Sequence, residues 1–390
     1  MEFSRRGRWA VPAGVLAAVG AVMAGALIST AQASPALPAR TPAQLLAAIA
    51  GRTGPPPALT GTVVESASLG LPQLPGTDNP TSVTSLLTGS HTVRIWYAGP
   101  RHFRLAVPGM MSESDLIVNG GTAWYWQSST NSVTRFALPA GAGPAVREPA
   151  PAMALTPQQA AKQALAAVGP STKVSVQSNV TVAGEAAYQL VLAPRSAGSL
   201  IGQVRIAVDG ARYVPLRVQI FARGATSPAF QVGFTSVSFV RPAAPNFTPP
   251  PGATVKTVTL GPAEHARAGT HTAGAAPQVI GNNWLSVAVL PASDLAGLSG
   301  LGGGSAAVGK AASSAAQAAS GSGPAGASGG SGEGAAVLGA ALKSTTPVHG
   351  AWGSGRLLRT GLLSVLMTNG RVLVGAVTPS VLYADAAHIK

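Results

Sequence analysis

The residues of this chain that could perform chemistry are few and poorly placed for it. Residues 304–310 match the first seven positions of a phosphate-binding loop, but Ala311 stands where that loop needs Ser or Thr to hold magnesium. His265 and His271 lie in a Pro/Gly/Ala-rich stretch with only Glu264 nearby, so a metal ion would lack rigid ligands. We therefore expect solvated linker residues at both places, and neither a metal nor a cofactor.

Two other arrangements could imitate a functional site. Glu113 and Asp115 would share one face of a strand as a carboxylate pair, but we expect a solvated strand edge whose charges discourage aggregation. Trp124 and Trp126 could form a platform for a sugar, although half-buried aromatic residues are common in strands anyway. Gly353-Ser354-Gly355 lacks the spacing of a G-x-S-x-G nucleophile elbow. We expect a binding protein and not an enzyme.

The composition indicates a folded, cationic chain. Of its 390 residues, 46% are hydrophobic and only 10% are charged, which is ample material for a core. The net charge of +14 comes mainly from the scarcity of Asp and Glu, and it is diffuse. Diffuse positive charge favours anionic surfaces such as phospholipid head groups, whereas nucleic-acid binding normally shows a concentrated Lys/Arg stripe. The absence of cysteine excludes disulfides, thiolate metal sites and cysteine nucleophiles.

The N-terminus has the features of an export signal. Three arginines within the first eight residues precede an apolar run at 9–28, and Ala31-Gln32-Ala33 matches a cleavage site. We expect residues 1–33 to be a signal peptide. The alternative is an uncleaved anchor, because the run approaches the length that spans a bilayer. The protein is expected to be exported, either secreted or at the extracytoplasmic side of the cytoplasmic membrane.

Two helices and a long series of strands are predicted. Thr41-Pro42 and Thr156-Pro157 each place a capping threonine before a proline, and Gly51 and Gly169 are stop signals. Elsewhere apolar residues alternate with polar ones, and tight turns such as Asn119-Gly120 connect the alternating segments, which must then pair antiparallel. The predicted strands cover residues 93–97, 103–107, 115–118, 123–126, 174–182, 186–193, 203–208, 214–222 and 230–240.

Irregularities in this pattern predict a bent sheet. The alternation slips within residues 233–236, which predicts a β-bulge, and Pro215 inside its strand argues for an edge or a bulge. Such features bend a sheet without closing it. The expected fold class is α+β, mainly β, with a strongly curved antiparallel half-barrel and covering helices.

Three segments carry a resemblance to a known family. Residues 95–103 (Ile-Trp-Tyr-Ala-Gly-Pro-Arg-His-Phe), 116–125 and 247–255 resemble, in this order, the LolA-like periplasmic lipoprotein carriers. The resemblance covers residues 59–255. It implies a half-open barrel of about eleven antiparallel strands under a helical lid, which holds the acyl chains of a lipoprotein. The chain departs from the carriers at Gly99, where they have an arginine that bonds to the lid.

This departure keeps a second reading open. The longer connection at residues 66–89 resembles the secreted LolA-like proteins of GC-rich actinobacteria. The RseB/MucB regulators share the fold and bind the extracytoplasmic part of an anti-sigma factor. The resemblance thus implies either lipid or lipoprotein acyl chains or a membrane protein as the partner. In both cases we expect the cytoplasmic membrane surface to be near, and no nucleic acid to be bound.

The remainder of the chain extends beyond the resemblance. We expect a half-barrel domain at 40–258, a linker at 259–277, and a C-terminal β module at 278–390 that contains a disordered Ala/Gly/Ser tract at 301–334. In the module, strands are predicted at 284–290, 357–367 and 372–377, with a hairpin turn at Asn369-Gly370 and a terminal helix at 379–387. The sequence leaves open whether these strands form an added sheet or dock on the main one.

The candidate binding site is the apolar concave face of the half-barrel with the covering helix. An ordinary core between the sheet and the helix is the alternative, and the residues alone leave both open. The candidate residues are Leu45, Leu46, Ile49, Val93, Ile95, Tyr97, Phe103, Leu105, Val107, Leu216, Val218, Ile220, Phe230, Val232 and Phe234.

Overall fold

The computed structural model describes most of the region that the sequence assigns to folded structure. The described residues from Ala36 onward belong to one compact unit. The predicted signal at 1–33, the linker at 259–277 and the Ala/Gly/Ser tract at 301–334 lie outside the described residues, as do the loop-like residues 304–310 and both linker histidines. The described ranges are 35–52, 54–68, 88–109, 111–137, 156–166, 168–258, 278–292 and 344–389.

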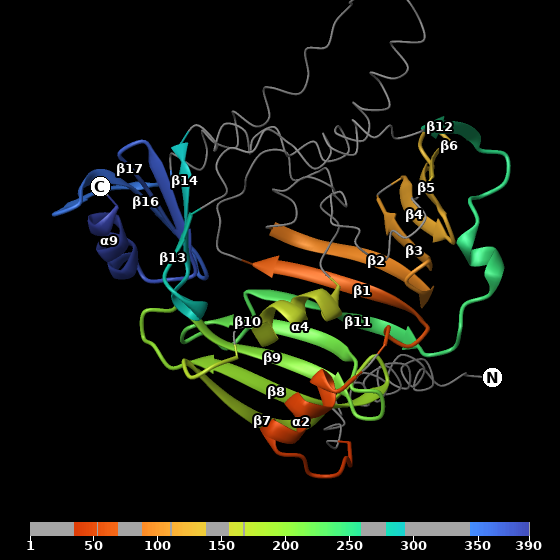
Figure 1. Cartoon of the computed structure of the whole chain (residues 1–390), viewed down its shortest axis with the longest axis horizontal. Coiled ribbons are helices and arrows are strands. Elements are labelled where there is room, and N and C mark those ends of the chain that lie inside the picture. Colours follow the sequence, from red (N-terminus) through yellow and green to blue (C-terminus); the bar gives the residue numbers. More distant parts are fainter. Residues whose placement is uncertain are drawn as a thin grey trace, which may run out of the picture. The chain divides into compact units, whose positions relative to one another are not determined.

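The main sheet has twelve strands in the order β12-β6-β5-β4-β3-β2-β1-β11-β10-β9-β8-β7 (Figure 1). It is curved and not closed, so the predicted mainly-β half-barrel is confirmed. Eleven strands pair antiparallel, and β12 adds to β6 in parallel, which the sequence analysis did not foresee. The strands are β1 (Leu59–Ser68), β2 (Thr88–Gly99), β3 (His102–Pro108), β4 (Glu113–Asn119), β5 (Thr122–Gln127), β6 (Ser132–Ala137), β7 (Thr172–Val182), β8 (Glu185–Pro194), β9 (Ile201–Asp209), β10 (Pro215–Ala222), β11 (Phe230–Ser238) and β12 (Thr254–Val258).

Both predicted irregularities are present. Thr62 pairs with Ser236 while Val63 pairs with Phe234, so one residue of β11 has no partner on β1 and forms the bulge. Pro215 opens β10, and the pairing with β9 shifts directly after it. Because β10 lies between β9 and β11, this proline marks an irregular strand start and not a sheet edge.

Two helices lie over one face of the sheet (Figure 1). Helix α2 (Pro42–Ala50) begins at a capping box, in which the Thr41 hydroxyl accepts from the Gln44 backbone and the Gln44 side chain accepts from the Thr41 backbone. Helix α4 (Pro157–Ala166) repeats this arrangement with Thr156 and Gln159. Helix α4 packs on β10 and β11, and α2 contacts β7. We call the face that they cover the inner face.

The C-terminal strands form a sheet of their own, in the order β13-β14-β18-β17-β16-β15. The prediction of one strand at 357–367 was wrong, because residues 360–363 form a turn between two strands, and Trp284 lies in the short 3-10 helix η3 (Asn283–Leu285) and not in a strand. The hairpin at Asn369-Gly370 and the final helix are confirmed. The elements are β13 (Gln278–Ile280), β14 (Val287–Pro291), β15 (Thr346–Gly350), β16 (Gly353–Arg359), β17 (Ser364–Thr368), β18 (Arg371–Gly375) and α9 (Pro379–His388).

Backbone hydrogen bonds join the two sheets. The loop between β8 and β9 donates from Leu200 N–H to the Ala376 carbonyl, and Thr378 N–H donates to the Gly198 carbonyl. Ser199 and Val377 form an isolated antiparallel bridge between these two bonds. The Trp284 indole also donates to the Thr172 hydroxyl at the start of β7, across 2.7 Å. The second sheet is therefore attached to the main one through specific polar contacts.

Candidate functional site on the inner face of the main sheet

The strand register places the candidate residues of the sheet on one face. Directly opposite residues share a face of a sheet. Val93 pairs with Val63, which pairs with Phe234, and Val232 pairs with Val218. All candidate residues except Phe103 belong to the main hydrophobic cluster or pack against it. Phe103 shares the inner face because it lies opposite Tyr97 on β2.

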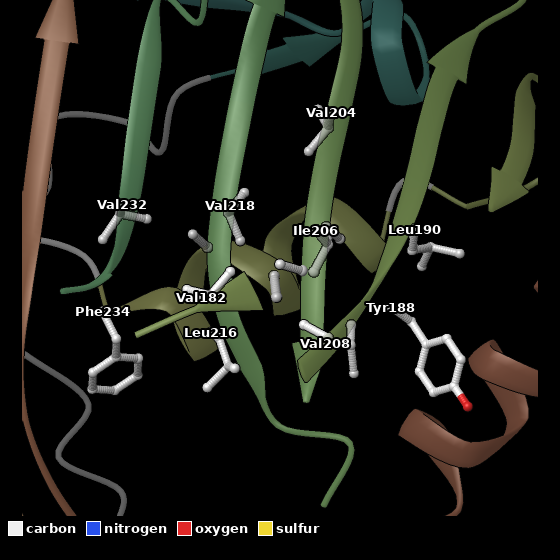
Figure 2. Close-up of a cluster of buried hydrophobic side chains, with 14 of the residues drawn as sticks. Val182, Tyr188, Leu190, Val204, Ile206, Val208, Leu216, Val218, Val232 and Phe234 are labelled. Carbon is white, nitrogen blue, oxygen red and sulfur yellow. The ribbon is translucent and has the colours of Figure 1, made fainter. Parts of the chain in front are cut away.

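One half of the inner face, from β8 to β11, is a packed core. Figure 2 shows side chains from β7 to β11 converging in this region. Leu216 and Val218 are 0% and 1% exposed, and Ile206 is 0% exposed. The interpretation as an ordinary core therefore describes this half, and its side chains are already in contact with protein. The candidates of this kind are Leu45 in α2 with Leu216, Val218, Val232 and Phe234 in the sheet; Val93 and Ile95 of β2 are buried as well.

The other half of the inner face is less covered. Tyr97, Phe103, Leu105 and Val107 on β2 and β3 are only half-buried. The remaining half-buried candidates lie at the margin of the packed half, namely Leu46 and Ile49 of α2 and Ile220 and Phe230 at the ends of β10 and β11. Burial still raises the pKa of the Tyr97 hydroxyl, which places that group in partly apolar surroundings. This half offers apolar surface that the packing of the described residues leaves partly accessible.

Three further residues belong to this half and were not predicted from the sequence. The register continues from Leu105 to Leu116 and on to Tyr125, so both residues share the inner face and both are half-buried. Phe136 joins them, since it lies opposite Ala123, which in turn lies opposite Val118 and Phe103. Extending the alternation of residues 103–107 across the predicted hairpin turn at Asn119-Gly120 would have found the first two.

A polar pair also lies on the inner face. Glu65 of β1 is 4% exposed and has Val232 and His91 as its direct cross-strand neighbours. Apolar binding sites commonly carry a few polar groups that fix the orientation of a ligand. Glu65 and His91 therefore give this otherwise apolar face one acidic and one basic side chain. The sequence analysis did not single out β1, whose apolar residues are interrupted by Gly, Thr, Glu and Ser.

The expectation of a solvated carboxylate pair was wrong for Asp115. Its side chain is 0% exposed on the outer face, in contact with a guanidinium nitrogen of Arg104, while Glu113 lies 3.6 Å from the same guanidinium. Burial raises the pKa of the Asp115 carboxyl to about 6, against the lowering effect of Arg104. Arg104 is also held over the Trp96 ring, 5.1 Å from its centroid. The cluster is an ordered part of the outer face.

The outer face is further covered by the chain that leads to β12. The 3-10 helix η2 (Ala244–Phe247) contacts β3 and β4, and its Phe247 is 3% exposed and packs edge-on against His102. Asn131 then accepts from Thr254 N–H through its carbonyl and donates from its side chain to the Gly252 carbonyl. These contacts fix β12 beside β6, and they leave the inner face of β2–β6 without this cover.

Comparisons with known proteins find similar folds. No protein-family model matches the chain, and no curated protein matches its sequence. The MucA/MucB complex structure of Pseudomonas aeruginosa is 14% identical, with 88% of this chain and 96% of that chain covered at a TM-score of 0.38. A LolA superfamily protein from Nitrosomonas europaea is 10% identical over 54% of this chain and 98% of its own, with a TM-score of 0.22. An uncharacterized conserved protein from Thermus thermophilus is 12% identical, with 55% of this chain and 98% of that chain covered at a TM-score of 0.29. These identities and TM-scores do not show membership of a family.

Among the described residues, no helix has the length and apolar character needed to cross a membrane.

Proposed function

We propose that this chain is an exported lipid- or lipoprotein-binding protein that holds acyl chains on the inner face of β2–β6. The observation that carries this proposal is the division of the inner face. The side chains of its β8–β11 half pack against one another and are buried. In the other half, a half-buried apolar surface is formed by Tyr97, Phe103, Leu105, Leu116 and Tyr125. Such a surface suits hydrocarbon, because contact with it removes apolar area from water on both partners.

Apolar contact alone would suffice for useful affinity. Burying one methylene group stabilises a complex by about 0.8 kcal/mol, so about fifteen methylenes of a fully buried acyl chain would contribute about 12 kcal/mol. Association costs several kcal/mol, and the surplus corresponds to weak or micromolar binding depending on how well the ligand is ordered. We therefore propose that the chain binds an acyl chain and does not catalyse a reaction on it. Glu65 and His91 are polar neighbours of the apolar surface.

The charge of the chain supports a site of action near a membrane. A net charge of +14, which is +14 − 2 = +12 without residues 1–33, attracts the chain to anionic phospholipid head groups, where an acyl chain would be collected or delivered. The predicted signal peptide would bring the protein to the extracytoplasmic side. Both the charge and the proposed ligand therefore favour the same compartment.

The proposal is tested by looking for the ligand directly. Native mass spectrometry of protein purified from its own host should show a bound lipid mass, and the delipidated protein should take up a fluorescent fatty acid. Leu105→Gln should weaken uptake at least fivefold, because it puts an amide into the half-buried inner face. Val64→Gln is the matched control, since Val64 is also half-buried but its neighbours Val63 and Glu65 are the inner-face residues of β1. Absence of both bound lipid and fatty-acid uptake would refute the proposal, and equal losses in the two variants would show that the inner face is not the site.

A second candidate is a regulator that binds a membrane protein. The second sheet favours it, because the edge strand β15 is largely exposed and its outer side pairs with no other described strand. An extended segment of a partner could add to such an edge through backbone hydrogen bonds. Crosslinking in host membranes followed by mass spectrometry should then recover one stoichiometric protein partner even from the delipidated chain, and recovery of none would exclude this candidate.

A further inference from the structure

The outer face of β7–β11 carries polar and cationic side chains among apolar ones, in contrast to the apolar inner face. Gln189 donates to Gln177 across 2.9 Å, and Gln219 donates to Gln231 across 2.6 Å, so two amide pairs bridge neighbouring strands. The same face carries Arg205 on β9 and Arg217 on β10. These residues belong neither to the inner face nor to the proposed acyl site.

Arg205 and Arg217 are neighbours, and Asp209, the acidic residue on the same face of β9, pairs with Arg212 instead of with either of them. Arg217 lies opposite Ala207 and Arg205 lies opposite Gln219, which makes the two arginines diagonal neighbours on one face. The salt bridges of the described residues involve Arg94, Arg104 and Arg212, and neither member of this pair. Burial and then the positive charge of Arg205 lower the pKa of Arg217. Two like charges are thus held together at a half-buried position.

Packing holds the stem of Arg217 and the guanidinium of Arg205. The stem of Arg217 crosses Gly233 so closely that a Cβ at this glycine would lie 2.8 Å from the Arg217 Cγ. The Nε of Arg217 is buried and has no hydrogen-bond partner. Arg205 lies over the buried Phe221 ring at 4.3 Å from its centroid, and the Gln203 amide, oriented to accept, lies 2.8 Å from Arg205 Nη2. Holding a pair of arginines in this way lowers the entropy cost of binding an anion.

We propose that Arg205 and Arg217 form a binding site for a phosphate-type oxyanion on the outer face of β9 and β10. Two arginines at diagonal positions of neighbouring strands offer two positive charges and hydrogen-bond donors from two sides, which suits a tetrahedral anion with three or more oxygens. A single carboxylate matches one planar guanidinium fork and would leave the second charge uncompensated. The amide donors of Gln219 and Gln231 lie in the same row as Arg205 and can supply further hydrogen bonds.

Calorimetric titration of the full chain with inorganic phosphate at low ionic strength tests the site. We expect saturable binding that weakens at least tenfold in the double variant Arg205→Gln/Arg217→Gln. Arg217→Lys should also weaken it severalfold, because a lysine keeps the charge but loses the fork. Arg241→Gln is the matched control, since it removes one charge from an exposed arginine outside the strands and should change the affinity less than twofold. Thermal unfolding of each variant, followed by circular dichroism, confirms that the variants are folded.

Vesicles distinguish the two sources of such an anion. Cosedimentation with phosphatidylcholine vesicles that contain phosphatidylglycerol, lost in the double variant and retained in Arg241→Gln, would identify a lipid head group. Phosphate binding without such cosedimentation would identify a soluble phosphate ester. Failure of phosphate to bind saturably, or equal weakening by Arg241→Gln and the double variant, would overturn the proposal. Neither result depends on fatty-acid uptake, so this site can fail while the acyl site stands.

Discussion

Arg104 places a guanidinium nitrogen against the carboxylate of Asp115, and yet neither oxygen of this carboxylate has a hydrogen-bond partner. The two residues come from neighbouring strands, since Asp115 lies opposite Ala106 and Arg104 lies opposite Ile117. A carboxylate with no exposed surface and two oxygens without a hydrogen bond is costly to ionise, even beside an arginine. Burial therefore outweighs the salt bridge and keeps the pKa of Asp115 high, at about 6.

This pKa predicts an unusual dependence of stability on pH. The pKa in the folded state lies above the value of 3.8 for an exposed aspartate, so the folded state binds more protons between these values. The contribution of Asp115 to the free energy of unfolding is therefore complete below pH 4 and falls by up to about 3 kcal/mol as the pH rises through 6. Urea denaturation at half-unit steps from pH 4 to 7 should show this loss in the wild type and not in Asp115→Asn.

A control variant separates this effect from the loss of any carboxylate. Glu185→Gln removes an acid whose side chain is 34% exposed beside Arg212, and it should leave the loss of stability between pH 4 and 6 in place. If Asp115→Asn retains the wild-type pH profile, the buried carboxyl is not the group that titrates.

Much of the fold was predictable because its local signals agree with its long-range pairing. Asn119-Gly120 predicted a hairpin, and the register places Asn119 opposite Thr122 across that turn. Threonine before proline predicted both helix starts, and each is a capping box. The bulge lies where the pairing of β1 with β11 shifts between Thr62 and Val63. It was predicted because the apolar residues of β11 change from even to odd positions there. In these cases the residues that determine the geometry are neighbours in sequence.

The rest depends on contacts between distant residues. The parallel pairing of β12 with β6 is fixed by hydrogen bonds between Asn131 and the segment at Gly252. These residues are more than a hundred positions apart, so no local sequence pattern predicts the pairing. The burial of Asp115 depends on what covers the outer face. Whether an apolar inner face is core or binding surface is decided by where α2 and α4 lie, and alternation is identical in both cases. The candidate site was therefore predicted as a face, and its division into a packed and a less covered half was not.

The packed half predicts large losses of stability on truncation. Leu216 is 0% exposed within the main cluster, so Leu216→Ala should lower the free energy of unfolding by about 2–5 kcal/mol through lost burial and a residual cavity. Chemical denaturation followed by tryptophan fluorescence measures this loss. Val240→Ala, at a position that is 71% exposed, should change stability by no more than about 0.5 kcal/mol. A loss below about 1 kcal/mol at Leu216 would mean that this half is open and able to take up a ligand.

Gly61 predicts a steric limit at the bulge. A Cβ at this position would lie 2.5 Å from the Ser236 carbonyl oxygen and 2.8 Å from the Phe234 ring. Gly61→Ala should therefore force β1 and β11 apart and lower the free energy of unfolding by about 1–3 kcal/mol. Gly121→Ala is the control, because its Cβ would meet nothing within 4 Å. Equal stabilities of the two variants would show that the bulge adjusts without cost.

The bond between Trp284 and Thr172 predicts energetic coupling between the two sheets. The indole Nε1–H donates to the Thr172 hydroxyl at 2.7 Å, and both side chains are buried, 8% and 5% exposed. A buried hydrogen bond of this kind contributes about 0.5–1.5 kcal/mol, and leaving one partner unsatisfied costs more. In a double-mutant cycle, Trp284→Phe and Thr172→Val should each destabilise the chain, and the double variant should lose about 1 kcal/mol less than the sum. The same cycle with Trp284→Phe and Val240→Ala should be additive. Additivity of the first pair would mean that this bond does not hold the start of β7 to the second sheet.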